Sequence, residues 1–138
     1  MTSFNSVLLI EDDPVTVIVC DRITKSTGFS KSFNYVENGL EGINYIKRMA
    51  DEENSGLPDV IFLDLNMPVM DGWEFLDRFK EIEHLFPYQP AVYILSSSVD
   101  AEDQHRALAY PIVKKFLSKP LNKTYLEKIS TEYNVSCY

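Results

Sequence analysis

The sequence predicts an α/β fold in which five parallel strands form one doubly wound sheet with helices on both faces. Short apolar runs of strand length alternate five times with segments of helical periodicity, which is the pattern of a parallel sheet with helical crossovers. The 138 residues, 45% of them hydrophobic, fit one domain that buries its own core. We therefore expect a single domain spanning residues 1–138, without an output domain.

The strands differ in how apolar they are, and this difference predicts their order in the sheet. The three uniformly apolar runs are Val7–Ile10, Val60–Leu63 and Val92–Leu95. Two mixed runs, Phe33–Val36 and Val113–Leu117, contain Asn34 or the pair Lys114 and Lys115. Central strands of a parallel sheet are buried on both faces and edge strands are not, so the mixed runs belong at the edges. The order 2-1-3-4-5 with right-handed crossovers satisfies this arrangement.

Helical spacing of apolar residues predicts a helix after each strand. Pro14 opens the first helix, the fourth follows Asp100 and is weakly apolar, and the chain after Pro120 suffices for the fifth. The residues that define the five apolar faces are Val15, Ile18, Val19 and Ile23; Leu40, Ile43 and Ile46; Phe75, Leu76, Phe79 and Ile82; Ala101, Ala107 and Leu108; and Leu121, Tyr125, Leu126 and Ile129.

Composition excludes several classes of protein. The net charge of −8 argues against a protein that binds a nucleic-acid backbone through a basic face. The N-terminal apolar run is too short for a signal peptide, and no run approaches the roughly 20 apolar residues of a membrane span. Cys20 and Cys137 do not make a disulfide framework, so a reducing cytoplasm is the expected location.

Acidic, hydroxyl and basic side chains follow the predicted strands. They are Glu11-Asp12-Asp13 after strand 1, Asp64 after strand 3, Ser96-Ser97-Ser98 after strand 4, and Lys119-Pro120 after strand 5. Ligands of open parallel sheets bind at the carboxyl ends of the strands, near the point where strand order reverses. We therefore expect Asp12, Asp13 and Asp64 to converge at this edge.

Clustered carboxylates need protons or a cation, because a like-charged pair at ~4 Å repels by about 4 kcal/mol at an effective dielectric of 20. Oxygen ligands with an open side favour Mg²⁺, which retains waters and shares phosphate oxygens. Lys119 would then face an incoming phosphoryl group, and the Ser96 hydroxyl could hydrogen-bond to it.

These residues resemble the receiver domain of two-component response regulators, of the stand-alone type typified by the chemotaxis regulator. The motifs that carry the resemblance are Asp12-Asp13, Asp64 in "DLNMPVMDG", Ser96 after "YIL", and Lys119-Pro120. The resemblance covers the chain from Val7 to about Tyr133. It implies the flavodoxin-like, CheY-like (βα)5 fold.

The resemblance also implies a role for each residue. Asp64 is the phosphoacceptor, which takes a phosphoryl group from a phosphohistidine on a sensor histidine kinase or a His-phosphotransfer domain. Asp12, Asp13, Asp64 and the backbone carbonyl of Asn66 are the expected Mg²⁺ ligands. The expected phosphoryl-binding residues are Ser96, Ser97 and Lys119, and the expected switch pair is Ser96 and Phe116. The bond between Lys119 and Pro120 is expected to be cis.

Two departures from the family pattern concern the switch. Phe116 stands where Tyr is common, so the signal would depend on ring packing alone. Tyr110-Pro111-Ile112 replaces the usual small Gly-Ala pair before strand 5, which leaves open the outline of the face formed by helix 4, strand 5 and helix 5.

The function implied is phosphorelay signal transduction, in which phosphorylation changes the face that docks a downstream protein target. The only expected chemistry is self-catalysed phosphoryl acceptance and acyl-phosphate hydrolysis, so we do not expect an enzyme. Two alternatives stay open: a scaffold that binds partners regardless of phosphorylation, and a Mg²⁺-dependent phosphohydrolase with an aspartyl-phosphate intermediate. Asn66 disfavours the phosphohydrolase, because it cannot do the acid–base work of the second acid that such enzymes use. The sequence leaves open phosphorylation-dependent dimerisation.

Overall fold

Five parallel strands form one sheet in the order β2-β1-β3-β4-β5, as the sequence predicts. The computed structural model describes residues 3–52, 56–98 and 100–136. The strands are β1 (Phe4–Ile10), β2 (Ser30–Val36), β3 (Val60–Leu63), β4 (Ala91–Ser96) and β5 (Val113–Ser118). The helices are α1 (Pro14–Thr27), α2 (Gly39–Asp51), α3 (Gly72–Ile82), α4 (Ala101–Leu108) and α5 (Lys123–Ser136), with a short 3-10 turn at Glu83–Leu85.

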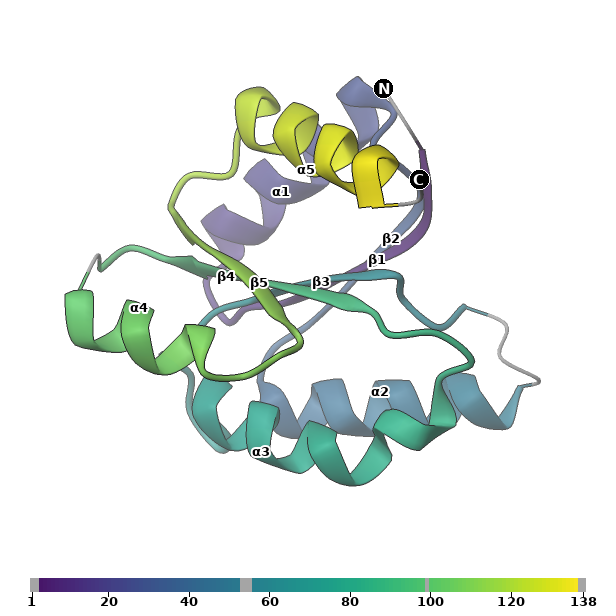
Figure 1. Ribbon diagram of the computed structural model, residues 1–138, viewed down its shortest axis with the longest axis vertical. Helices are drawn as coiled ribbons and strands as arrows, with labels where there is room; N and C mark the ends of the chain where they lie inside the picture. The colour runs from purple at the N-terminus through teal and green to yellow at the C-terminus, as the bar shows by residue number, and fades with distance from the viewer. Residues whose placement is uncertain (1–2, 53–55, 99, 137–138) are drawn as a thin grey trace.

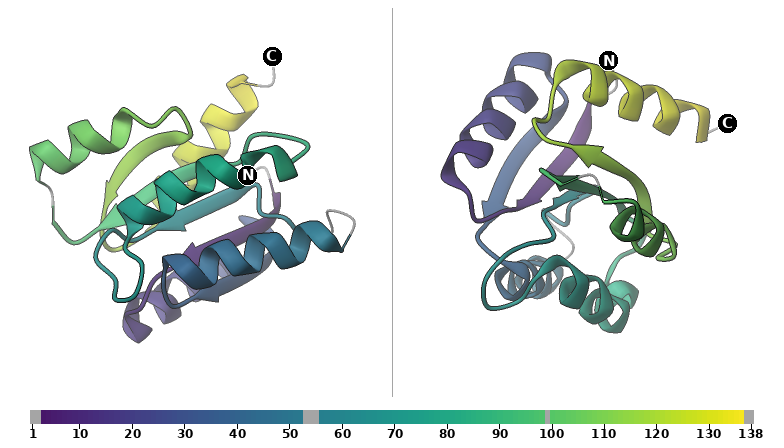
Figure 2. Two further views of the ribbon diagram at one scale, coloured as in Figure 1. Left: turned by 90° about the horizontal axis from the view of Figure 1, so that it is seen from below. Right: turned by 90° about the vertical axis from the view of Figure 1, so that its left-hand side faces the viewer.

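The helices form a layer on each face of the sheet, as expected for a doubly wound fold. In Figure 1, α1 and α5 lie above the strands, whereas α2 and α3 lie below them. The views in Figure 2 show the same two layers and place α4 beside β5. Each interface has its own apolar core: Phe29, Phe62 and Leu126 belong to the α1/α5 side, and Phe75 and Phe79 to the α2/α3 side.

The predicted difference between central and edge strands is confirmed. All four residues of β3 are buried, whereas β2 has no fully buried residue and β5 is only partly covered. The ladders of β1 with β2 and with β3 place the ends of these strands beside each other, with Ile10 opposite Val36 on one side and Leu63 on the other. The residues that follow β1 and β3 therefore emerge at the same edge.

Most of the apolar face predicted for the first helix lies on the outside of the molecule, and only Ile23 of its four residues packs against the core of the α1/α5 side. Val17, Cys20 and Thr24 are the buried residues of α1. Val15 and Ile18 are instead 66% and 50% exposed. The Thr24 hydroxyl can be buried because it donates to the Cys20 carbonyl one turn earlier, 2.8 Å away. The apolar pattern correctly predicted a helix but not which of its sides faces the sheet.

Among the described helices, none combines the length and the apolar character needed to cross a membrane.

Close packing of backbone around Gly72 ties the start of α3 to the end of β3. The Gly72 amide donates to the Leu65 carbonyl at 3.0 Å. A Cβ at position 72 would lie 2.6 Å from the Asp64 carbonyl oxygen and 2.9 Å from the Leu65 Cα. Only a residue without a side chain fits here, and this contact fixes the loop that follows Asp64.

We predict that Gly72→Ala lowers the free energy of unfolding by about 2 kcal/mol, because its methyl group would overlap backbone that cannot move aside. Gly42→Ala is the matched control, since the Cβ would first meet the terminal methyl group of Ile10, at 2.8 Å, a side-chain atom and not backbone, and α2 gains helix propensity. We expect the control to stay within about 1 kcal/mol of the wild type. Urea unfolding of both variants measures the difference, and equal losses would contradict this account.

Candidate functional site

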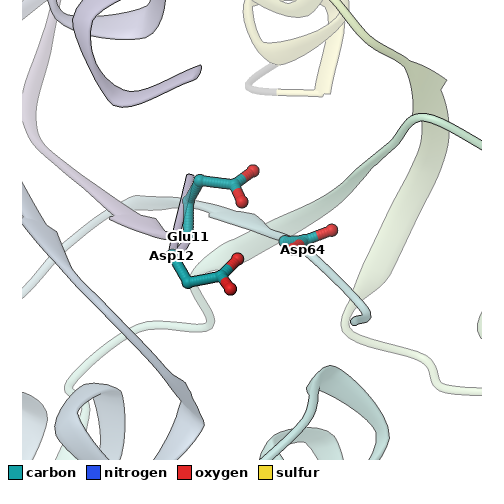
Figure 3. A group of neighbouring side chains, drawn as sticks. All are labelled: Glu11, Asp12 and Asp64. Carbon is teal, nitrogen blue, oxygen red and sulfur yellow. The ribbon is translucent and has the colours of Figure 1, made fainter. Parts of the chain in front are cut away.

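Three carboxylates converge at the carboxyl edge of the sheet. Glu11 and Asp12 follow β1, and Asp64 follows β3. One oxygen from each side chain lies within 4.8 Å of the others. Figure 3 shows the three side chains around one space, with Glu11 and Asp12 coming from one strand end and Asp64 from its neighbour.

Backbone hydrogen bonds of the sheet continue into the site and hold these acids in place. The Glu11 amide donates to the Val36 carbonyl, and the Asp64 amide donates to the Ile10 carbonyl, both at 3.0 Å. Glu11 and Asp64 are buried, whereas Asp12 is exposed. The cluster therefore has a fixed, desolvated side and one side open to solvent.

Lys119 supplies the positive charge that faces the buried acids. Its Nζ lies 2.6 Å from Glu11 Oε1 and 3.6 Å from Asp64 Oδ1. Its amide donates to the Ser96 carbonyl at 2.8 Å, and its bond to Pro120 is cis, as expected. The ammonium is nearer to Glu11 than to Asp64, so the Asp64 carboxylate is not fully engaged in this ion pair.

Burial and mutual repulsion perturb the acids of the site. Burial, with the charge of Asp64 adding to it, raises the pKa of Glu11 to about 7 even though Lys119 opposes the shift. Burial is also the main cause that raises the pKa of Asp64. Burial alone would favour the neutral amine of Lys119, but its hydrogen bond to Glu11 and the charge of Asp64 raise its pKa. The site holds more negative charge than Lys119 can offset.

The structure brings Asp12 and Asp64 together as predicted, but Asp13 lies outside the cluster. The Asp13 carboxylate caps α1: it accepts from the Thr16 amide at 3.3 Å and from the Thr16 hydroxyl at 2.8 Å. Chiefly through the hydroxyl, these bonds lower the pKa of Asp13. The third acid of the cluster is Glu11, which the sequence reasoning did not select. Pro14 at the first position of α1 was the available signal, because it makes the residue before it the N-cap.

Ser96, Ser97 and Asn66 follow or end strands at the same edge, whereas Phe116 lies within β5. Ser96 is buried, and its hydroxyl accepts from the Ser98 amide at 3.1 Å, while Ser97 is exposed. The backbone N–H of Asn66 faces the Asp64 carboxylate as a donor and opposes the rise in the pKa of Asp64. The Phe116 ring is partly buried against the core of the α2/α3 side.

A family model described as the response regulator receiver domain matches residues 7–130. The chain belongs to this family. Its fold, with Asp64 at the end of β3 and Lys119 at the end of β5, is that of a receiver domain of a two-component response regulator.

Solved structures share this fold over nearly the whole receiver domain. A two-component response regulator from Cytophaga hutchinsonii is 32% identical, with a TM-score of 0.85 over 95% of this chain and 97% of that one. The Mn²⁺-bound form of the response regulator Rcp1 is 26% identical, with a TM-score of 0.71 over 91% of this chain and 88% of that one.

Curated relatives differ in how much of their length the receiver domain spans. The probable methanogenesis regulatory protein FilR2 of Methanothrix harundinacea is 29% identical over 91% of this chain and 79% of its own length. Hybrid signal transduction histidine kinase B of Dictyostelium discoideum is 27% identical over 83% of this chain but only 6% of its own length. The receiver domain thus occurs in proteins of very different size.

The acidic site fits a hard divalent cation. Its donors are carboxylate oxygens from Glu11, Asp12 and Asp64, and they lie close enough to share one ion. Burial is the main cause of the raised pKa values of Glu11 and Asp64, so their charged forms lack solvation that a bound cation would replace. This donor chemistry matches the Mg²⁺ that receiver domains typically bind.

We predict that the stability of the metal-free receiver domain falls as the pH rises through 7. The pKa of Glu11 is 4.5 when unperturbed and about 7 in the folded protein, so its protonation favours folding below 4.5 and this contribution is lost as the pH passes 7. Glu11→Gln removes the titration. Its unfolding free energy, relative to that of the wild type, should therefore be higher at pH 8 than at pH 5. Urea unfolding in a chelator at both pH values measures this, and an unchanged difference would contradict the shift.

Proposed function

We propose that this receiver domain accepts a phosphoryl group on Asp64 from a phosphohistidine, with Mg²⁺ bound beside it, and thereby changes the surface that it presents to another protein. The observation that carries the proposal is the position of Asp64 in the acidic cluster with Glu11 and Asp12, 3.6 Å from the Lys119 ammonium. A carboxylate placed there can act as a nucleophile in phosphoryl transfer, because a cation bound by the neighbouring acids and the Lys119 ammonium would both stabilise the negative charge of the transferred group.

The transfer has a simple balance. An Asp64 carboxylate oxygen attacks phosphorus, the bond between phosphorus and the histidine nitrogen breaks, and the nitrogen keeps the electron pair. Lys119 stands 3.6 Å from Asp64 and can pair with the oxygens of the transferred group. Hydrolysis by water would later return Asp64 to its free form. This self-directed chemistry does not turn over an external substrate, so we do not propose an enzyme.

The acids that surround Asp64 supply the ligands for the cation. Glu11 and Asp12 are placed to join Asp64 in holding Mg²⁺, directly or through water. The backbone carbonyl of Asn66 is the further ligand of this proposal. When bound, Mg²⁺ neutralises the crowded carboxylates and charge on the phosphoryl oxygens. The relative Rcp1, whose structure is described as a Mn²⁺-bound form, supports a divalent cation in this fold.

Exposed apolar side chains beside the site favour a protein as the phosphodonor. Val15, Ile18 and Val19 form an outward stripe on α1, which starts directly after the acidic cluster. Val69, in the loop after β3, is 76% exposed and has φ of 69°, a conformation that a β-branched residue rarely adopts. A histidine kinase or His-phosphotransfer domain that docks here would cover both surfaces and place its phosphohistidine at Asp64.

The response to phosphorylation is proposed to begin at Ser96. Its buried hydroxyl points into the segment after β4, where it accepts from the Ser98 amide. A new phosphoryl group offers strong acceptor oxygens, and the hydroxyl is drawn toward them. Phe116, partly buried on β5, then repacks, and the equilibrium between two surfaces shifts toward the one that binds a downstream protein.

The direct test of this function is phosphorylation by acetyl phosphate with Mg²⁺. We expect the wild type to gain one phosphoryl group by intact-protein mass spectrometry, and Asp64→Asn to gain none because its amide cannot attack phosphorus. Asp51→Asn, which changes an exposed carboxylate at the end of α2, is the matched control and should be phosphorylated like the wild type. A wild-type protein that gains no phosphoryl group and does not bind beryllofluoride would refute the function.

Magnesium titration identifies which acids hold the ion. We predict that Asp12→Asn weakens Mg²⁺ binding at least about ten-fold, since it removes one charge from the cluster. Asp13→Asn should leave the affinity near that of the wild type, because Asp13 caps α1 and Asn is also a good N-cap. Isothermal titration calorimetry measures both. A large loss for Asp13→Asn with none for Asp12→Asn would reverse the assignment.

A further inference from the structure

A cluster of aromatic and charged side chains joins α3 to α4 on the outside of the fold. The Arg106 guanidinium carbon lies 4.1 Å from the centre of the Trp73 ring, and the Trp73 and Tyr110 rings stack at 6.4 Å with 29° between their planes. The Tyr110 hydroxyl donates to Asp77 Oδ1 at 2.7 Å, and Lys80 Nζ lies 4.8 Å from the Tyr110 ring centre. These five residues are called the α3–α4 latch below.

The latch matters because α4, which otherwise packs against β5, buries little apolar surface of its own. Of its eight residues only Ala107 is buried, whereas α3 buries five. Figures 1 and 2 show α4 at the outer side of the sheet, next to β5. A helix with so little buried apolar surface belongs to the least stable part of a fold, so surface contacts decide where it rests.

The chemistry of the latch makes it a specific contact and not general packing. A guanidinium over an indole face is the favoured cation–π geometry, and a hydroxyl that donates to a carboxylate is a charge-assisted bond. Burial and the bond to Asp77 raise the pKa of Tyr110. Both contacts depend on the present spacing of α3 and α4.

The two ends of α4 are held by different groups. Ser98, which precedes α4 by three residues, donates its amide to the Ser96 hydroxyl. Arg106, near the end of α4, and Tyr110, two residues after it, bind α3. A movement of Ser96 toward Asp64 breaks the hydrogen bond to the Ser98 amide before α4. For α4 to change position, the contacts of Arg106 and Tyr110 with α3 must break as well.

We propose that the α3–α4 latch stabilises the unphosphorylated position of α4 and thereby sets how readily the receiver domain switches. This rests on the proposed function, since it assumes that a phosphoryl group on Asp64 acts on Ser96. The latch contributes only to the resting state, so weakening it shifts the equilibrium toward the switched state and raises the affinity for any ligand of that state.

The test compares beryllofluoride binding by the wild type with that by two latch variants in saturating Mg²⁺. Tyr110→Phe removes the hydroxyl but keeps the ring, and Arg106→Gln removes the cation. We expect each to bind beryllofluoride about five-fold more tightly by calorimetry. Tyr88→Phe is the matched control, because it removes a hydroxyl that donates to the Leu57 carbonyl far from α4. Its affinity should equal that of the wild type.

A second readout follows the latch itself. Trp73 is the only tryptophan of the chain, so its fluorescence reports whether Arg106 leaves the ring. We expect beryllofluoride to change the emission of the wild type. The change should be smaller in Arg106→Gln, where the cation is already absent. Thermal unfolding checks that the variants fold, and Asp77→Asn, at an exposed position, replaces Tyr110→Phe if that variant does not.

The outcomes separate the two proposals. Unchanged or weaker beryllofluoride binding by both latch variants would overturn the latch and leave the proposed function intact. Wild-type binding without any change in Trp73 emission would do the same. A wild-type protein that binds no beryllofluoride would remove the proposed function, and the latch proposal with it.

Discussion

The balance between three carboxylates and one ammonium at the carboxyl edge of the sheet is the constraint on which the site depends. Glu11, Asp12 and Asp64 share a space a few ångströms across, with Lys119 on the buried side. Two of the acids emerge from strands whose ladders fix them, so the repulsion cannot be relieved by moving them apart. The repulsion can be relieved only by a proton or by a cation in addition to Lys119. The same geometry therefore destabilises the metal-free site and favours the binding of Mg²⁺.

The sequence was sufficient to predict the fold because its signals are local and redundant. Apolar runs gave the strands, their polarity gave the order in the sheet, and the topology then placed Asp64 and Lys119 at one edge. Which acid after β1 points inward was not predictable in the same way. Three acids follow one another there, and the chain leaves the extended conformation among them, so alternation no longer tells which side each residue faces. The need of α1 for an N-cap decides the matter in favour of Glu11 and Asp12 over Asp13.

The outward side of α1 illustrates a second limit of sequence reasoning. Periodicity measures how apolar residues are spaced, but a helix that buries one face against the sheet and offers another to a partner has two apolar sides. In α1 the buried side uses Val17 and Cys20, together with a hydroxyl whose bond lies within the helix. The more apolar side, with Val15 and Ile18, is left to solvent. A mismatch of this kind between apolar pattern and burial is itself an indication of a docking surface.

The same constraint determines which parts of the receiver domain can respond when Asp64 changes. Glu11 and Asp64 are held by main-chain bonds to neighbouring strands, so new charge at Asp64 cannot displace the sheet at modest cost. Ser96 lies one strand further out, at the end of β4, and Lys119 lies two strands further out, directly after β5. The Lys119 amide donates to the Ser96 carbonyl. A displacement of either side chain toward Asp64 therefore also displaces the segments that lead into α4 and α5. Because α4 has a single buried residue, it is the element that moves at the lowest cost in free energy. The contacts between α4 and α3 oppose this movement and therefore reduce the population of the switched state.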